Sequence, residues 1–139
     1  MNEVIRTGQL VITFLRSRHD TDGMLDMFEF LVPVGARVPA AHYHKSWDET
    51  VYGLDGKMTF TVDGVESVIG PGDHIFIRRG QVHQFINRGS EDARALSVLT
   101  PGVIGPEYFR AIAAVINAGG PPDLGKVKEV MLKFGLVPA

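Results

Sequence analysis

Short apolar segments alternate with polar turn residues over roughly the first hundred positions of the chain. Val, Ile, Phe and Thr dominate these segments, while Gly, Pro and Asp separate them, which is the pattern of short β-strands joined by tight turns. The pattern predicts strands at residues 9–16, 25–33, 37–43, 49–54, 57–62, 65–69, 74–78, 82–87 and 94–99. Many short strands in succession indicate an all-β sandwich or barrel.

Three turns can be predicted from their residues. Asp55-Gly56 and Asp63-Gly64 each stand between two strand-like runs, and such dipeptides favour tight hairpins. Gly70-Pro71-Gly72 marks a further break between strands.

Beyond the last predicted strand the apolar residues recur at helical spacing. One helix is predicted to begin near Pro106 and to end at Gly119-Gly120. A second is predicted to begin after Asp123, which can cap its first turn, and to stop at Gly135. We therefore expect a pair of short C-terminal α-helices.

The length of the chain, 139 residues, suits a single hydrophobic core. We expect a β-barrel over residues 1–102 and a helical extension over residues 103–139. The helices are too short to form a separate domain, so they are expected to pack on the barrel or on a partner subunit.

Composition and charge exclude several classes of protein. The chain is 45% hydrophobic and 22% charged, and its formal net charge of −2 gives no basic footprint for nucleic acid or an anionic membrane. It contains no cysteine, which excludes disulfides and thiolate metal ligands. Neither a signal peptide nor a membrane-spanning apolar stretch is visible, so a cytoplasmic location is expected.

The stretch "HYHKSWDE" carries the most informative polar residues. Side chains alternate faces along a strand, so His42 and His44 point the same way and can bind one ion together. Two adjacent carboxylates, Asp48 and Glu49, follow at the start of the next predicted strand. A polar surface strand is the alternative, because one H-x-H pair is a weak signal for a metal site.

A second polar segment downstream makes the pattern more specific. Residues 35–56 read G-x6-H-x-H-x4-E-x6-G, and residues 72–87 read G-x5-R-x-G-x2-H-x3-N, with His83 as the histidine. These two blocks closely resemble the two sequence motifs of the cupin superfamily, and the chain resembles its small single-domain members. The resemblance covers about residues 25–100, which leaves the helical extension outside it.

The blocks depart from the family pattern at two places. One extra residue separates Gly35 from His42, and Arg78 stands where the family usually has proline. The missing proline concerns a turn, and neither departure removes a metal ligand.

The resemblance implies a double-stranded β-helix, also called a jelly-roll barrel, that holds one divalent transition metal ion. Its metal ligands fall on His42, His44, Glu49 and His83 in this sequence. Imidazoles and a carboxylate suit Fe, Mn, Ni, Zn, Co or Cu, and four protein ligands in an octahedral field leave two positions open. A metal-free network of hydrogen-bonded polar residues is the alternative.

A substrate pocket is expected beside the metal. A metal surrounded by apolar side chains is the usual arrangement for a small organic ligand. Trp47 is expected either at the mouth of this pocket or at a subunit interface. The residues predicted to form the pocket are Trp47, Val51, Phe60, Phe76, Phe85 and Asn87.

The resemblance also implies a function. A dioxygenase of the quercetinase type, or an isomerase or decarboxylase of the same fold, would bind its substrate or dioxygen at the open metal positions, with Glu49 as a base. A non-enzymatic protein that binds or senses a small molecule through its metal is the alternative. A metal-free subunit whose helices recruit a partner is a third possibility. A homodimer is expected, formed by residues 9–16 adding to a neighbour's sheet.

Overall fold

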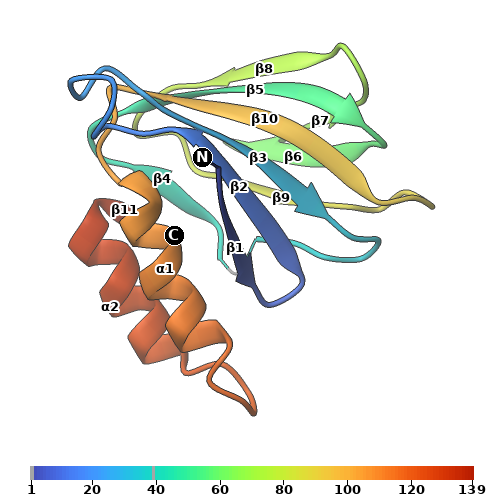
Figure 1. Cartoon of the computed structure of the whole chain (residues 1–139). Helices are drawn as coiled ribbons and strands as arrows, with labels where there is room; N and C mark the ends of the chain where they lie inside the picture. The colour runs from blue at the N-terminus through green and yellow to red at the C-terminus, as the bar shows by residue number, and fades with distance from the viewer. Residues whose placement is uncertain (1, 39) are drawn as a thin grey trace.

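The computed structural model describes residues 2–38 and 40–139, and shows two antiparallel sheets with a pair of helices beside one end (Figure 1). The larger sheet consists, in spatial order, of β1 (Glu3–Thr7), β2 (Leu10–Arg16), β3 (Asp26–Val32), β10 (Ala93–Thr100), β5 (Asp48–Asp55) and β8 (His74–Ile77). The smaller sheet consists of β11 (Leu136–Pro138), β4 (His42–His44), β9 (His83–Ile86), β6 (Met58–Val62) and β7 (Val65–Ile69). The chain crosses repeatedly between the sheets, as in a double-stranded β-helix. The predicted fold class is confirmed.

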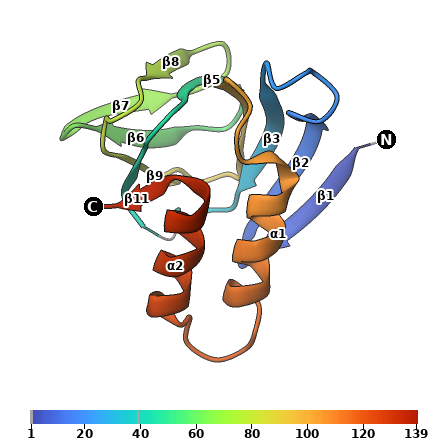
Figure 2. The ribbon, with the colours of Figure 1, turned by 90° about the vertical axis from the view of Figure 1, so that its left-hand side faces the viewer.

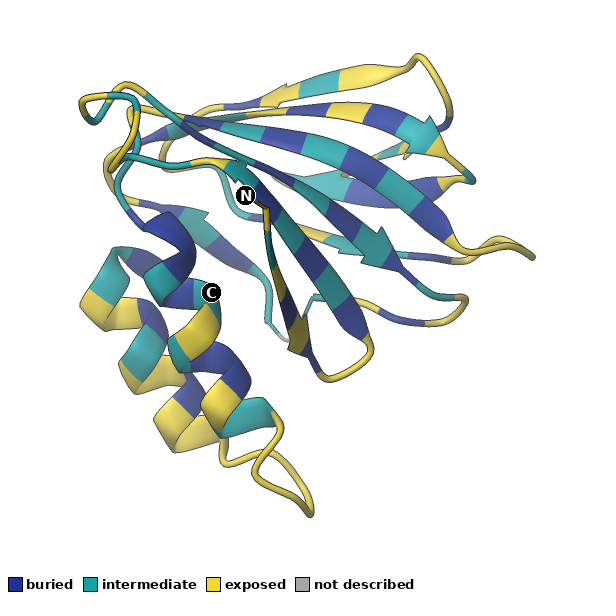
Figure 3. Cartoon of the chain, viewed as in Figure 1, coloured by how far each residue is buried: buried dark blue, intermediate teal, exposed yellow. Residues whose placement is uncertain are grey.

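Strand alternation builds the interior of the barrel. Along β3 every second residue is buried, which turns Phe28 and Phe30 inward. β10 pairs with β3 so that Ser97 lies opposite Phe28, and its buried positions alternate in the same way. Figure 3 shows these alternating bands on the larger sheet.

One predicted hairpin forms and another does not. Asp63-Gly64 joins β6 to β7 with Val62 opposite Val65, and both turn residues adopt positive φ (48° and 81°), as a tight hairpin requires. The hairpin predicted at Asp55-Gly56 is wrong, because this turn carries the chain from β5 in one sheet to β6 in the other. A Cβ on Gly56 would lie 2.4 Å from the Asp92 carbonyl oxygen, so glycine is needed there for close approach.

Several strand boundaries differ from the prediction. The strand predicted at 37–43 is regular only from His42, while Arg37 makes an isolated bridge to Ile86 and residue 39 lies outside the described residues. β1 and β11 were not predicted. β1 has exposed or half-buried polar residues at Glu3 and Arg6, and β11 is only three residues long and follows a helix stop.

The C-terminal extension contains α1 (Gly105–Ile116) and α2 (Leu124–Phe134), which lie side by side (Figure 2). α1 packs against β1, and β11 then pairs with β4. The first turn of α1 has no side-chain cap of its own; instead the buried Asp26 carboxylate accepts hydrogen bonds from Val103 N and Gly105 N, both at 3.1 Å. The barrel itself therefore anchors the start of α1, although the boundary between residues 102 and 103 stays a prediction. Among the described residues, no helix combines the length and apolar character needed to cross a membrane.

Candidate metal centre

Two neighbouring strands of the smaller sheet bring three histidines together. β4 carries His42 and His44 on one face, and its register places His42 opposite His83 of β9. Each of the three offers a ring nitrogen within 4.8 Å of the others, and all three residues are buried. The Nε2 atoms of His42 and His44 are 3.2 Å apart. The structure therefore forms a compact histidine group with the spacing of metal ligands.

Backbone carbonyls orient two of these rings. His42 Nδ1 lies 2.8 Å from the Ala40 carbonyl oxygen, and His83 Nδ1 lies 2.9 Å from the Gln81 carbonyl oxygen. A neutral imidazole that donates through Nδ1 keeps a free lone pair on Nε2. His44 Nδ1 is buried without a hydrogen-bond partner. The group therefore contains a buried ring nitrogen without a partner, a deficit that a cation would remove, so these residues fit a metal ion.

The protonation of the histidines favours the same conclusion. Burial and the nearby His83 lower the pKa of His42 to about 4. Burial also lowers the pKa of His44 to about 3, although the Glu49 carboxylate opposes this effect. Both rings are therefore neutral near pH 7, and neutral imidazole is the form that binds a metal.

Glu49 approaches the histidines from β5 in the opposite sheet. Its Oε1 lies 3.9 Å from His44 Nδ1 and 3.6 Å from His83 Nε2, while its Oε2 accepts a 2.6 Å hydrogen bond from the Ser97 hydroxyl. Burial alone would raise the pKa of Glu49, but His83, His44 and Ser97 together lower it to about 2. For His83 the ion pair with Glu49 outweighs burial and raises the pKa of the ring. The predicted ligands therefore gather at one place, with the three histidines closest together.

Asp48, the neighbouring carboxylate, is directed elsewhere. It accepts hydrogen bonds from the backbone N of Arg79 at 2.9 Å and from Arg79 Nε and Nη2 at 3.2 Å each. These bonds lower the pKa of Asp48. They also hold the turn after Arg78, where the family usually has proline, and Gly80 N in the same turn donates to the His44 carbonyl oxygen at 2.9 Å. The turn thus forms without proline.

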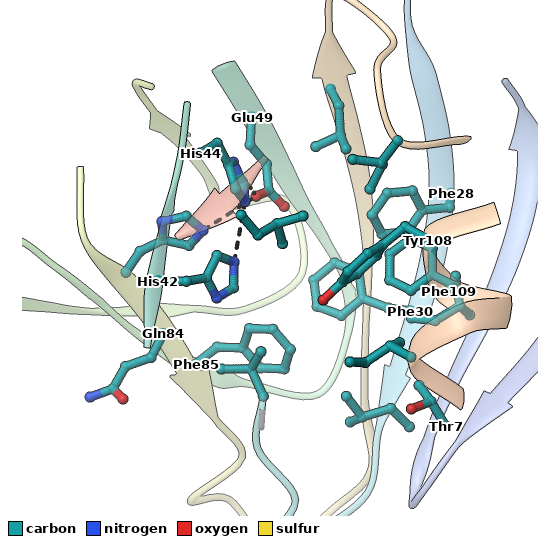
Figure 4. A pocket seen from close by; sticks show the side chains of 18 of the residues that line it. Thr7, Phe28, Phe30, His42, His44, Glu49, Gln84, Phe85, Tyr108 and Phe109 are labelled. Carbon is teal, nitrogen blue, oxygen red and sulfur yellow. Dashed lines mark hydrogen bonds and ion pairs between the residues drawn. The ribbon is translucent and has the colours of Figure 1, made fainter. Parts of the chain in front are cut away.

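A cavity of about 100 Å³ adjoins the histidines and Glu49. The polar groups of the metal centre lie on one side of it, and aromatic side chains line much of the rest (Figure 4). Of the residues predicted to form a pocket, Phe60 and Phe85 line this cavity, together with Phe28 and Phe30.

Phe76 and Val51 do not line this cavity. Phe76 lies between Ile75 and Ile77 on β8. These two residues pair with Val51 and Glu49 of β5, respectively, whose side chains face inward. Phe76 instead pairs with Thr50 on the outer face and is 54% exposed. The prediction that Phe76 lines the pocket was therefore wrong, because the side chain points to the opposite face of the sheet. Val51 does face inward, but it is fully buried away from the cavity.

Trp47 and Asn87 also have positions other than those predicted. Trp47 is fully buried and stacks on His44, with ring centroids 4.7 Å apart and an interplanar angle of 20°, so it lies neither at a pocket mouth nor on the surface. The Asn87 amide nitrogen donates to the carbonyl oxygens of Val32 and Glu91, and its oxygen accepts from Gly89 N. These bonds use the Asn87 amide to hold a turn.

Much of the cavity wall comes from outside the two motifs, and the motifs alone could not indicate it. The helical periodicity of residues 106–118 was the one available signal, because it predicted a buried face without showing what that face covers. These wall residues include Thr7 of β1, Ile104, Tyr108, Phe109 and Ile112 at and along α1, and Leu136 of β11.

Comparison with known proteins agrees with this geometry. Residues 28–99, more than half of the chain, match the family described as the cupin domain. The chain belongs to the cupin family.

Two curated proteins and one solved structure illustrate the relationship. Quercetin 2,3-dioxygenase of Bacillus subtilis (strain 168) is 32% identical over 106 residues, which cover 76% of this chain and 31% of that protein. Tetracenomycin polyketide synthase protein TcmJ of Streptomyces glaucescens is 30% identical over 86 residues, covering 60% of this chain and 58% of that one. The structure of the polyketide cyclase RemF from Streptomyces resistomycificus superposes with a TM-score of 0.62 at 26% identity, over 76% of this chain and 75% of that one. This chain therefore spans less than two thirds of either curated relative.

Proposed function

We propose that this cupin binds one divalent transition metal ion through His42, His44, Glu49 and His83. The convergence of three buried imidazoles beside an ionised carboxylate carries this proposal. Such a mixed nitrogen and oxygen set accepts Fe, Mn, Ni, Zn, Co or Cu. When bound, the metal would supply Lewis acidity and open positions for a ligand oxygen or dioxygen.

The activity we propose is dioxygenase-like oxidation of a small ring compound that carries adjacent oxygen atoms. The similarity to a quercetin 2,3-dioxygenase supports this reaction class. Glu49 Oε1 faces the histidines while Oε2 is held by Ser97, so Oε1 is the atom placed to accept a proton from a ligand hydroxyl. The walls away from the histidines are largely apolar, and a volume of about 100 Å³ suits a single ring better than a polycyclic ligand.

Metal content and oxygen uptake test this proposal. The metal-free protein would be loaded in turn with Fe(II), Mn(II), Ni(II), Co(II), Zn(II) or Cu(II), and oxygen consumption measured with catechols, diketones and quercetin. We expect uptake with at least one redox-active metal, and its loss in Glu49→Gln but not in the exposed control Glu129→Gln. Silence with every metal, together with tight binding of one compound, would instead assign a binding or sensing role.

A second candidate reaction is the rearrangement or ring closure of a polyketide-like substrate without dioxygen. The similarity to TcmJ and to the polyketide cyclase RemF favours it. Oxygen labelling separates the two reactions, because a dioxygenase incorporates oxygen atoms from labelled dioxygen into its product, whereas a rearrangement or ring closure incorporates none. Turnover by the Zn(II) form without oxygen would support the second candidate.

Assembly and location complete the proposal. The strand expected to join a partner, residues 9–16, forms β2, which already pairs with β1 on one side and β3 on the other. We therefore place the homodimer contact at β1, the edge strand, where Val4 is 54% exposed. A monomer by light scattering at micromolar concentration would reject it. A small-molecule ligand and a cytoplasmic location stay predictions.

A further inference from the structure

Two hydroxyl groups are set into the apolar wall of the cavity. Thr7 of β1 and Tyr108 of α1 both line the cavity, and each residue is only 7% exposed. Figure 4 shows both side chains extending from their elements into the cavity, with the Tyr108 hydroxyl directed toward its interior. Phe28, Phe109 and Ile112, which line the same side, offer only hydrocarbon.

Both hydroxyls lack a hydrogen-bond partner among the residues that the structure describes. Thr7 Oγ1 is buried without one, and within residues 2–38 and 40–139 no hydrogen bond from the Tyr108 hydroxyl is found. A buried hydroxyl that satisfies no hydrogen bond costs free energy, so such groups normally meet a partner. Burial also raises the pKa of Tyr108, which keeps its phenol protonated and able to donate.

The two hydroxyls are held in place. Asn117, at the end of α1, accepts a hydrogen bond from Gly8 N at 2.8 Å and donates to the Arg6 carbonyl oxygen at 2.7 Å. These bonds bracket Thr7 and tie its strand to the helix that carries Tyr108. Both groups are therefore pre-organised for a ligand.

We infer that the Tyr108 and Thr7 hydroxyls bind oxygen atoms of the ligand that lie away from the metal centre. The preferred ligand is then a ring compound with two adjacent oxygens for the metal and a further hydroxyl or carbonyl group across the ring. This inference rests on the proposed function, because the metal fixes which end of the ligand faces the histidines. Thr7 and Tyr108 both lie outside the cupin-domain match at residues 28–99, so this selectivity is a property of the added hairpin and helix.

A matched pair of ligands tests the inference by binding alone. 4-(Hydroxymethyl)catechol and 4-ethylcatechol differ by one hydroxyl in place of one methyl group. Both would be titrated calorimetrically, without oxygen, into the Ni(II)-loaded full chain. We expect the hydroxymethyl compound to bind about three- to tenfold more tightly, the effect of one or two net hydrogen bonds.

Variants attribute this preference to the two residues. Tyr108→Phe and Thr7→Val should each reduce the ratio of the two dissociation constants toward one, and Thr7→Ser should retain it. Tyr52→Phe and Thr50→Val, at exposed positions, are the matched controls and should keep the wild-type ratio.

The outcomes separate this inference from the proposed function. Metal-dependent binding of both catechols with no preference, or a preference that survives in Tyr108→Phe and Thr7→Val, overturns the inference and leaves the metal site intact. Failure of both compounds to bind the Ni(II) form, with binding no better than in the metal-free protein, rejects the proposed ligand class and the inference with it.

Discussion

At the residue scale, the groups around the proposed metal centre orient the side chains of its candidate ligands. The carbonyl oxygens of Ala40 and Gln81 orient the rings of His42 and His83. Ser97 holds one oxygen of Glu49 at 2.6 Å. Partners of this kind set the orientation and basicity of ligands, so they contribute to affinity without touching the metal.

Ser97→Ala should weaken metal binding by about ten- to a hundredfold, because Glu49 loses the bond that orients it. Competition for Ni(II) against a coloured chelator measures the change. Ser67→Ala, a serine on β7 away from the histidines, is the control and should bind like the wild type. An unchanged affinity in Ser97→Ala would show that the bond does not orient a ligand.

The metal-free protein should lose stability as the pH falls from 6 to 5. The pKa values of His42 and His44 are lowered from 6.5 to about 4 and about 3, so in this range the unfolded chain binds protons that the folded chain does not. His42 and His44 should each reduce the unfolding free energy by about 1 kcal/mol as the pH falls from 6 to 5. Glu49, with its lowered pKa, contributes only below about pH 4.5.

Urea unfolding at the two pH values measures this dependence. His44→Gln should show about half of the change seen in the wild type, and the exposed His74→Gln should show all of it. An equal change in wild type and His44→Gln would contradict the origin proposed for it.

At the element scale, the C-terminal end of α2 packs against Trp47, the residue that stacks on His44. Gly135 ends the helix with φ 90° and leads directly into β11, which pairs with the histidine strand β4. A Cβ at this position would lie 3.1 Å from Trp47 Cζ3, and Trp47 stacks on His44. The helix stop and the histidine ring are therefore in contact through a single tryptophan.

Gly135→Ala should lower the unfolding free energy by about 2–4 kcal/mol, through both its positive φ and the contact with Trp47. Gly120→Ala is the matched control, because it has a positive φ of 71° with nothing within 4 Å of its added Cβ. It should cost only about 1 kcal/mol. Chemical denaturation measures the unfolding free energies of both variants. Only Gly135→Ala should also weaken Ni(II) binding. Equal costs would exclude the contact.

At the scale of the whole molecule, the helical extension and the barrel share one core. Phe109 of α1 packs against Phe28 and Phe14 with ring centroids 5.0 and 5.9 Å apart. The cavity is bounded by both parts, and α1 packs against β1 while α2 packs against α1 and β11. Neither part buries its apolar face without the other.

Barrel and extension should therefore unfold in one transition. Fluorescence of the single Trp47 reports the barrel beside the metal centre, and far-ultraviolet circular dichroism at the helical band reports α1 and α2. The two melting temperatures should agree within about 2 °C. Separate transitions would show that residues 103–139 form an independent unit.

The features of this site that depend on residues close together in the sequence were predictable, and those that depend on distant residues were not. His42 and His44 could be placed on one face because strand alternation is a local rule. Phe76 obeys the same rule, but its face depends on the register with β5, and register is set by pairing across the sheet. Trp47 and Asn87 were placed wrongly because their neighbours come from segments far away, such as Gly135 and Val32.

By itself, the sequence determined the all-β class and the helical pair, because alternation and helix stops act within short windows. The candidate set of three histidines and one carboxylate came from the resemblance to the two cupin motifs. Only the tertiary structure decided that Asp55-Gly56 joins two sheets, that Asp48 binds Arg79, and that Tyr108 and Thr7 meet at one cavity. Those outcomes depend on which distant surfaces pack together. Burial of apolar area is non-directional, so the choice between surfaces rests on the complementarity of the whole chain, which no local pattern contains.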